Sequence, residues 1–137
     1  MKFLKTKKGD KVLVELTIHQ IVGFTTYTIG KFLCVGEVTR ATGKFIDVKH
    51  PDETFTRRHR ILDGLQHGGG DKRPIFPYQE DKDQTELWKN EVSRIESVRA
   101  LDFSLPSLHP LDYSKVTKQE ADQILKQIKA LPKIKRG

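Results

Sequence analysis

The sequence predicts an α+β fold in which a small antiparallel five-stranded β-barrel is followed by two C-terminal helices. Between residues 9 and 64, short runs of β-branched and aromatic residues alternate with turns rich in Gly, Pro and Asp, a pattern typical of antiparallel strands. Beyond residue 82, apolar residues recur every three or four positions behind capping sequences, which indicates amphipathic helices. Strands so short and so closely spaced favour a small barrel over a parallel βαβ layout.

The barrel region contains five expected strands. In the first, Val12, Val14 and Leu16 occupy every second position, so one face of the strand points inward. His19-Gln20 is expected to break the pairing, and Gly23 predicts a bulge or bend that curls the sheet. The predicted strands are Lys11–Ile18, Ile21–Ile29, Lys31–Thr39, Lys44–Val48 and Thr54–Ile61.

Four regions are expected along the chain. Residues 1–8 form a basic N-terminal arm, residues 9–64 the barrel, residues 65–82 a linker rich in Gly and Pro, and residues 83–137 a helical region that packs on the barrel. The linker prediction follows from three successive glycines, since glycine loses the most backbone entropy on ordering. Its second half is expected to place a Phe or Tyr against the core.

Two capping boxes mark the helices. The first is Asp83 to Glu86, before an apolar stripe that begins at Trp88, and this helix is expected to end near residues 100–102. The second is Thr117 to Glu120, before a helix that stops ahead of Pro132. Packing on the barrel or on each other is expected for both stripes. The alternatives are that Trp88 anchors a partner, or that the helices pair with a second copy of the chain.

Charge is unevenly distributed along the 137 residues. The formal net charge is +7 and the isoelectric point about 9.5. Residues 1–70 hold 12 of the 25 Lys and Arg residues but only 7 of the 18 Asp and Glu residues. The positive excess therefore lies mainly in the predicted barrel, which favours an acidic partner and nucleic acid above all. The alternative is ordinary charge that keeps the protein in solution.

Cys34 is the single cysteine, which excludes an internal disulfide and a Cys-based zinc site. It lies within an apolar run, so a buried thiol is expected rather than a nucleophile. The basic start of the chain leads into Gly9-Asp10 rather than an apolar signal sequence, and no apolar segment is long enough to span a membrane. The prediction is a soluble cytoplasmic protein with no membrane partner.

Basic residues on or beside consecutive strands form the candidate nucleic-acid site. Arginine forks suit phosphate oxygens, and the neighbouring Tyr27, Phe45 and Phe55 offer rings for unpaired bases, although Phe45 is expected in the core. Six engaged phosphates would make log affinity fall with log salt at a slope of roughly −4 to −5. The predicted phosphate-binding residues are Arg40, Lys44, Lys49, Arg57, Arg58 and Arg60.

No residue set indicates catalysis, a cofactor or a metal. The chain contains no nucleophile elbow, no P-loop spacing and no zincin pair of histidines. The turn after His50 allows it to approach His59, the one pairing that bears on a metal hypothesis. Four carboxylates near the basic strand would suit a metal-dependent nuclease, but carboxylates interleaved with Arg are expected to form surface ion pairs. These four are Asp47, Asp52, Glu53 and Asp63.

Short motifs punctuate the barrel region: Gly9-Asp10 before the first strand, Gly36–Arg40 at the middle hairpin, then Lys44–Val48 and Thr54–Arg57. This pattern resembles small five-stranded barrels of the Tudor/KOW type, which are SH3-like. It is similar in particular to short barrel proteins of bacteriophages and prophages, in which a Phe-x-Arg-x-x-Gly ending precedes a polar helical tail. Phe55-Thr56-Arg57 matches that ending, whereas Gly64 lies further along than the pattern places it.

The resemblance implies a non-catalytic binding module. Its expected role is a nucleic-acid-binding accessory or regulatory protein of phage origin. The alternative is a protein-interaction module that binds and inhibits or modulates a host protein, for example a nucleic-acid enzyme. Salt sensitivity would distinguish the first from the second, which would depend more on apolar residues and show a defined stoichiometry.

Overall fold

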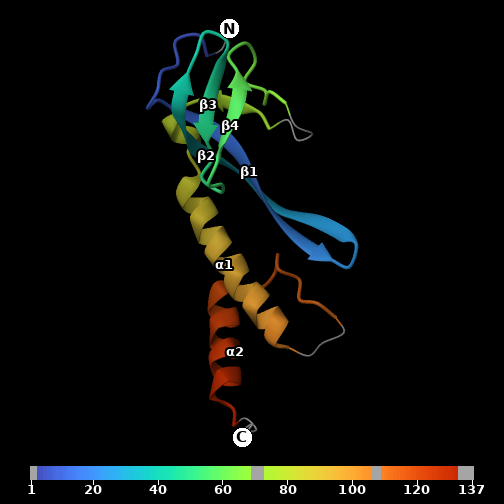
Figure 1. Cartoon of the computed structure of the whole chain (residues 1–137). Coiled ribbons are helices and arrows are strands. Elements are labelled where there is room, and N and C mark those ends of the chain that lie inside the picture. Colours follow the sequence, from blue (N-terminus) through green and yellow to red (C-terminus); the bar gives the residue numbers. More distant parts are fainter. Residues whose placement is uncertain (1–2, 69–72, 106–108, 133–137) are drawn as a thin grey trace, which may run out of the picture. The chain divides into compact units, whose positions relative to one another are not determined.

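The computed structural model describes residues 3–68, 73–105 and 109–132 (Figure 1). The chain forms two compact units, one of Met1–Thr17 with Gly30–Trp88 and one of Ile18–Ile29 with Lys89–Gly137. Three predicted features fall partly outside the described residues: the start of the basic arm, the glycine run and the charged C-terminal tail.

Five antiparallel strands form a half-barrel and two helices follow, as the sequence predicts. The order of the strands in the sheet is β4-β3-β2-β1-β5. A 3-10 turn, η1, precedes the first helix. The elements are β1 (Lys11–Val22), β2 (Thr25–Ala41), β3 (Phe45–Lys49), β4 (Thr56–Arg60), β5 (Ile75–Pro77), η1 (Glu80–Lys82), α1 (Thr85–Ser104) and α2 (Lys118–Ala130).

The strand boundaries differ from the prediction in the first half of the sheet. β1 continues through the expected break at His19-Gln20 and ends at Val22, inside the second predicted strand. The rest of that predicted strand is continuous with the third in a single strand, β2. Gly23 forms the turn between β1 and β2 rather than a bulge inside a strand. Its φ of 62° explains this, because a positive φ suits a tight hairpin turn.

The fifth strand lies where the sequence predicted a linker. β5 pairs with β1 in antiparallel register, with Ile75 opposite Val14 and Pro77 opposite Val12. The flanking prolines suggested an irregular connection, but β5 is an edge strand, and an edge tolerates a residue that has no N–H to donate. Ile75 is buried and belongs to the core.

The first unit has a hydrophobic core built from the inner face of the sheet. Cys34 is buried in it, and burial raises the pKa of its thiol to about 12, which agrees with the expected inert thiol. Trp88 and Phe32 pack against the core while partly exposed. The buried members are Phe3, Val12, Val14, Leu16, Cys34, Val38, Ile46, Val48, Ile61 and Ile75.

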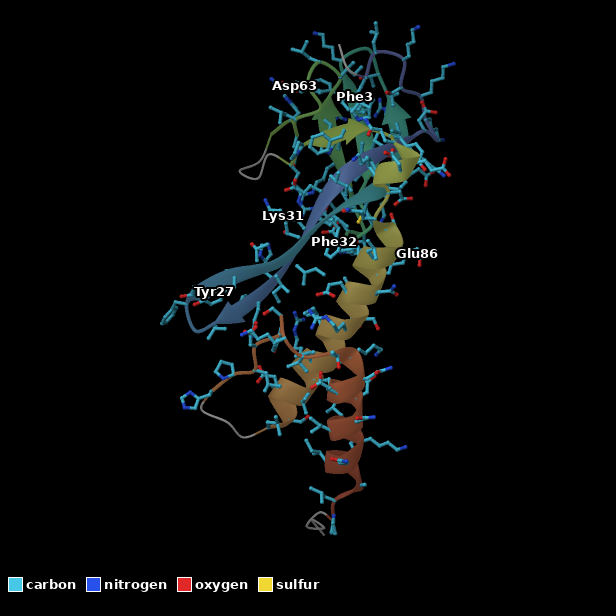
Figure 2. The ribbon with its side chains drawn as sticks, turned by 180° about the vertical axis from the view of Figure 1, so that it is seen from behind. Phe3, Tyr27, Lys31, Phe32, Asp63 and Glu86 are labelled. Atoms are coloured by element: carbon cyan, nitrogen blue, oxygen red, sulfur yellow. The ribbon has the colours of Figure 1, made fainter. Side chains whose placement is uncertain are left out.

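Phe3 anchors the N-terminal segment to the core of the first unit. Its ring is buried, and its N–H donates to the Ile61 carbonyl at 3.2 Å (Figure 2). One aromatic side chain is enough to hold the start of the chain against the core, although the neighbouring Lys5, Lys7 and Lys8 stay exposed. The basic side chains are therefore displayed from an anchored segment.

The start of α1 is joined to β2. Gln84 exchanges two hydrogen bonds with the backbone of Leu33, as its side-chain oxygen accepts the Leu33 N–H and its own N–H donates to the Leu33 carbonyl, both at 2.8 Å. Thr85 Oγ1 accepts the Val35 N–H at 3.1 Å. Asp83 accepts the Thr85 N–H at 3.0 Å, so its side chain caps the start of α1.

In the second unit, side chains clamp the segment that leads into α2. Gln20 donates to the Leu111 carbonyl at 2.6 Å and accepts the Tyr113 N–H at 3.2 Å. Asp102 accepts from the Leu111 N–H and from the Tyr113 hydroxyl, each at 3.0 Å. Arg94 donates to the Tyr113 carbonyl at 2.5 Å. These bonds satisfy backbone groups of a segment that has no regular secondary structure.

The two helices follow the predicted pattern with a shift at one end. α1 buries Ile95, Val98 and Leu101 and extends to Ser104, slightly beyond the predicted end. The capping box of α2 is confirmed, because Thr117 Oγ1 accepts the Glu120 N–H at 3.1 Å and Glu120 accepts the Thr117 N–H at 3.4 Å. α2 ends at Ala130, before Pro132 as predicted.

Gly64 is the position where the first unit tolerates a side chain least. Its φ is 75°, and an added Cβ would lie 2.7 Å from both the Ile75 carbonyl oxygen and the Phe3 ring. We expect Gly64→Ala to destabilise the protein by about 3 kcal/mol, from left-handed backbone strain plus overpacking. Urea unfolding followed by Trp88 fluorescence measures this loss.

Gly9→Ala is the matched control for that substitution. Gly9 also has a positive φ, 91°, but its Cβ would meet nothing within 4 Å. It should lose only the backbone strain, about 1 kcal/mol. Equal losses for the two variants would contradict the close packing of Phe3 and Ile75 around Gly64.

Candidate nucleic-acid interface and a buried histidine pair

The register of β2, β3 and β4 sorts the basic residues onto two faces. Arg40 lies opposite Asp47, which lies opposite Arg58, so these three share the outer face. Phe45 and Arg60 are paired on that same face. We call this surface the aromatic–basic face and define it as Arg40, Phe45, Arg58, Arg60 and the adjoining His67. Lys44 is exposed and directly precedes β3.

Phe45 is the centre of this face, which corrects the expectation that it belongs to the core. It is half-buried and lies on the outer face, because the buried residues Ile46 and Val48 of β3 occupy the alternate, inward positions. The His67 ring lies 4.6 Å from the Phe45 ring, centroid to centroid, and the Arg58 guanidinium lies 5.6 Å from it. The exposed imidazole of His67 and guanidinium of Arg58 thus lie against the Phe45 ring.

Two arginines of the aromatic–basic face are ion-paired, as the interleaved carboxylates predict. Arg58 Nε lies 3.1 Å from Asp47, and Arg60 forms a two-point contact with Asp63. The hydrogen bond from Arg60 lowers the pKa of the Asp63 carboxyl. Within the part of the chain that the structure describes, Arg40 and Lys44 have no carboxylate within 4.0 Å.

Arg57 lies on the inner face, away from Arg58 and Arg60. It shares a cross-strand row with Val48, its side chain is only 16% exposed, and it donates twice to Glu53 at 2.5 Å. A third bond joins it to Gln66 at 2.9 Å. The sequence run Arg57-Arg58-His59-Arg60 therefore does not act as one cationic surface, since strand alternation divides it.

The other predicted site residues are Lys49 and Trp88, and the rings offered for stacking include Phe55 and Tyr27. The register places Lys49 on the same side of β3 as Asp47. Lys49 donates to the backbone carbonyls of His50 and Glu53, so its ammonium group is held at the turn. Trp88 packs against the core of the first unit, which leaves its partner-binding role a prediction. Phe55 is exposed, and Tyr27 is exposed near the end of the β1–β2 hairpin (Figure 2).

A buried histidine pair links β3 to β4. His50 and His59 are both 0% exposed, and their Nε2 atoms lie 3.1 Å apart. His59 Nδ1 lies 3.0 Å from the Gly64 carbonyl oxygen, which can only accept. The sequence showed that the two residues flank one turn, but their burial depends on the register that places His59 opposite Ile46.

Burial keeps both rings neutral. It lowers the pKa of His50 to about 4, assisted by the neighbouring His59 and Arg73, and it lowers the pKa of His59. Neutral His59 then donates from Nδ1 to Gly64 and accepts at Nε2 from His50, so the pair forms a directed hydrogen-bond chain.

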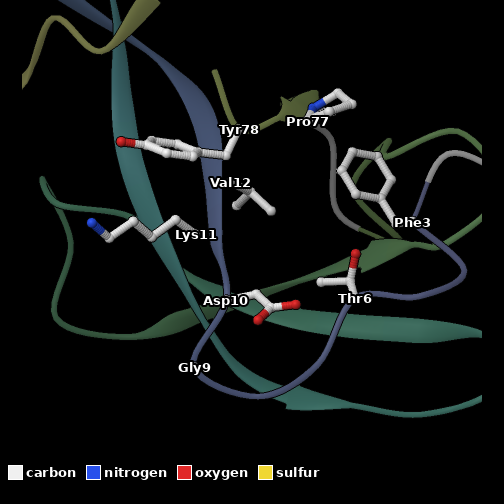
Figure 3. A pocket seen from close by; sticks show the side chains of 8 residues that line it. All are labelled: Phe3, Thr6, Gly9, Asp10, Lys11, Val12, Pro77 and Tyr78. Carbon is white, nitrogen blue, oxygen red and sulfur yellow. The ribbon is translucent and has the colours of Figure 1, made fainter. Parts of the chain in front are cut away.

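A pocket of about 440 Å³ lies where β1 meets β5 (Figure 3). Lys11 and Tyr78 line one side, with the Lys11 ammonium 5.5 Å from the Tyr78 ring centroid, and Phe3 and Thr6 line the other. Asp10 accepts the Lys7 N–H at 2.8 Å. Asp10 and Lys11 in this pocket thus each contact a neighbouring group of the chain.

These features define an α+β protein whose half-barrel carries an aromatic and cationic outer face. Compared with known proteins, the chain matches no family model, no curated protein and no solved structure. Among the described residues, no helix is long and apolar enough to cross a membrane.

The histidine pair makes stability depend on pH. The pKa of His50 is about 4 in the folded state and about 6.5 when unfolded. The free energy of unfolding is therefore highest above pH 6.5 and decreases as the pH drops toward 4, because the unfolded state binds the proton first. We expect the free energy of unfolding to be about 2 kcal/mol lower at pH 5 than at pH 7. Urea unfolding at the two pH values tests the size of this loss.

An NMR titration assigns the effect to these rings. The ring nitrogens of His50 should keep neutral-form chemical shifts at pH 5.5, and those of His59 should titrate below the ordinary pKa of histidine. Glu53 is a carboxyl whose pKa the Arg57 hydrogen bonds lower, so it stays ionised over this range and does not confuse the result. Titration of either buried ring near pH 6.5 would contradict the proposed proton arrangement.

Proposed function

We propose that this protein binds nucleic acid without catalysing a reaction, through its aromatic–basic face. The observation that supports this most is the Arg58–Phe45–His67 cluster, because it holds two flat, exposed groups on a half-buried ring. Guanidinium and aromatic planes stack on nucleobases, and base stacking contributes about 1–3 kcal/mol per base.

Exposed cations on and beside the aromatic–basic face would supply phosphate contacts. Arg40 and Lys44 are exposed, and Arg58 is 48% exposed on its side chain. An exposed ion pair contributes only about 0–1 kcal/mol, so a phosphate can replace Asp47 or Asp63 as the partner of an arginine at little loss. This favours a backbone-tracking mode of binding with stacked bases, and therefore single strands over duplexes.

We propose the Tudor/KOW-like barrel as the relative of this fold and a phage or prophage accessory or regulatory role as its setting, acting in the cytoplasm. The support is the five-stranded antiparallel half-barrel together with the Gly9-Asp10 pair that precedes β1. A small curved sheet with one charged outer face is the arrangement on which such binding modules depend.

Fluorescence anisotropy with labelled single- and double-stranded DNA and RNA tests the function. Four phosphate contacts, from Arg40, Lys44, Arg58 and Arg60, predict a log–log salt slope of about −3 for a single strand, smaller than the slope expected if all six predicted cations took part. We expect Arg58→Ala with His67→Ala to weaken binding at least about tenfold, since stacking surface is lost.

Lys126→Ala with Lys129→Ala is the matched control, because these lysines are exposed on α2 and lie in the other unit. It should leave affinity nearly unchanged. Absence of binding to every probe at about 50 mM salt, with the protein folded, would overturn the proposal.

A protein partner is the second candidate function, and the outer end of the β1–β2 hairpin is the observation that favours it. Phe24 is fully exposed, and Ile21 and Tyr27 are more than half exposed nearby. Adjacent exposed apolar side chains on a two-stranded ribbon are typical of interaction sites.

Substitution at the hairpin distinguishes this candidate from the first. Phe24→Ser should abolish a stoichiometric, salt-insensitive complex with a purified partner while leaving nucleic-acid affinity unchanged. The converse pattern, in which only Arg58→Ala affects the complex, would exclude the hairpin as the interface.

A further inference from the structure

We propose that the turn after β3 binds a first-row divalent metal ion of the Zn²⁺ class, with His50 Nδ1 and the carboxylates of Asp52 and Glu53 as its ligands. A ring nitrogen of His50 and one oxygen from each carboxylate all lie within 4.8 Å of one another. This site is separate from the aromatic–basic face and does not depend on the proposed nucleic-acid binding.

The hydrogen-bond chain through the histidines leaves one lone pair unused. Because the Gly64 carbonyl can only accept, His59 must carry its proton on Nδ1 and present a bare Nε2. His50 must then donate from its own Nε2, which leaves its Nδ1 unprotonated. Among the described residues, this fully buried Nδ1 atom has no hydrogen-bond partner.

A buried nitrogen lone pair without a donor is costly unless something fills it. A proton suits this nitrogen poorly, because the ring is fully buried and the Arg73 guanidinium already lies at the same two carboxylates. A metal ion needs an unprotonated nitrogen, which the hydrogen-bond chain leaves at His50 Nδ1. The other ring nitrogen of a metal-binding histidine normally donates to another group, as His50 Nε2 does to His59.

The carboxylates suit the same ion. Ligand atoms at about 2.1 Å from zinc in a tetrahedral site lie about 3.4 Å apart, so small side-chain rotations would close the observed spacing. Asp52 is exposed, which gives solvent access to the site and room for water to complete the coordination. Arg57 donates two hydrogen bonds to the Glu53 carboxylate, and such outer contacts orient a ligand carboxylate.

Arg73 is the group that the ion would displace. Its guanidinium lies 3.4 Å from Asp52 and 3.7 Å from Glu53, longer contacts than those that Arg57 makes. A divalent charge between two carboxylates replaces a single positive charge there. One imidazole nitrogen with two carboxylates favours Zn²⁺, Co²⁺ or Mn²⁺ over Mg²⁺ and Ca²⁺, which prefer oxygen ligands alone.

The experiment uses the full chain after chelator treatment and desalting. ZnCl₂, or MgCl₂ for comparison, is titrated while thermal unfolding is measured, and long-range ¹H–¹⁵N spectra follow the histidine rings. Zn²⁺ should raise the unfolding temperature in a saturable way and shift His50 Nδ1, whereas Mg²⁺ should do neither. Co²⁺ should give a visible absorption band from the same site.

Asp52→Asn is the test variant because Asp52 is exposed and its loss should not prevent folding. It should weaken Zn²⁺ binding at least about tenfold. Asp63→Asn, another carboxylate paired with an arginine, is the matched control and should bind normally. No effect of Zn²⁺ at about 100 µM on wild type, affinity unchanged in Asp52→Asn, or shifts confined to other histidines would each overturn the site.

Discussion

The first unit depends on a buried chain of hydrogen bonds that runs from His50 through His59 to the Gly64 carbonyl. The same carbonyl accepts the Ile75 N–H at 3.1 Å, so one backbone group joins the end of β4 to the start of β5. Phe3 packs where a side chain on Gly64 would otherwise stand. This hydrogen-bond chain thereby connects the turn after β3, β4, the turn at Gly64 and β5. Its polar atoms are buried at a position where an apolar residue would be the common choice.

This interior arrangement also decides what the surface displays. His59 points inward, so strand alternation sends Arg58 and Arg60 outward and turns Arg57 back toward Glu53 and Gln66. The three arginines thus take two separate roles. Arg58 and Arg60 contribute to the aromatic–basic face, and Arg57 contributes to the ordering of the turn that carries Asp52 and Glu53.

The two proposed sites use opposite properties of the same hairpin. The outer face offers exposed planes and cations whose partners can be exchanged at little energetic loss, as an electrostatic binding surface requires. The turn after β3 offers the buried His50 nitrogen and the carboxylates of Asp52 and Glu53, which suit a small ion of fixed geometry. Because side chains alternate between the two faces of the paired strands β3 and β4, residues one position apart lie in different chemical environments.

Local sequence determined the α+β class, the antiparallel strands of residues 11–61, the capping box of α2, the apolar stripe of α1 and the burial of Cys34, since turn chemistry, periodicity and apolar runs act over a few residues. It did not determine β5, the continuity of β1 and β2, the anchoring of Phe3 or the exposure of Phe45, because each depends on a partner distant in sequence. The same reason separates the predicted basic cluster from the observed one. Residue type indicated the cations, but only cross-strand register decided which of them share a face and which histidine nitrogen is left without a partner.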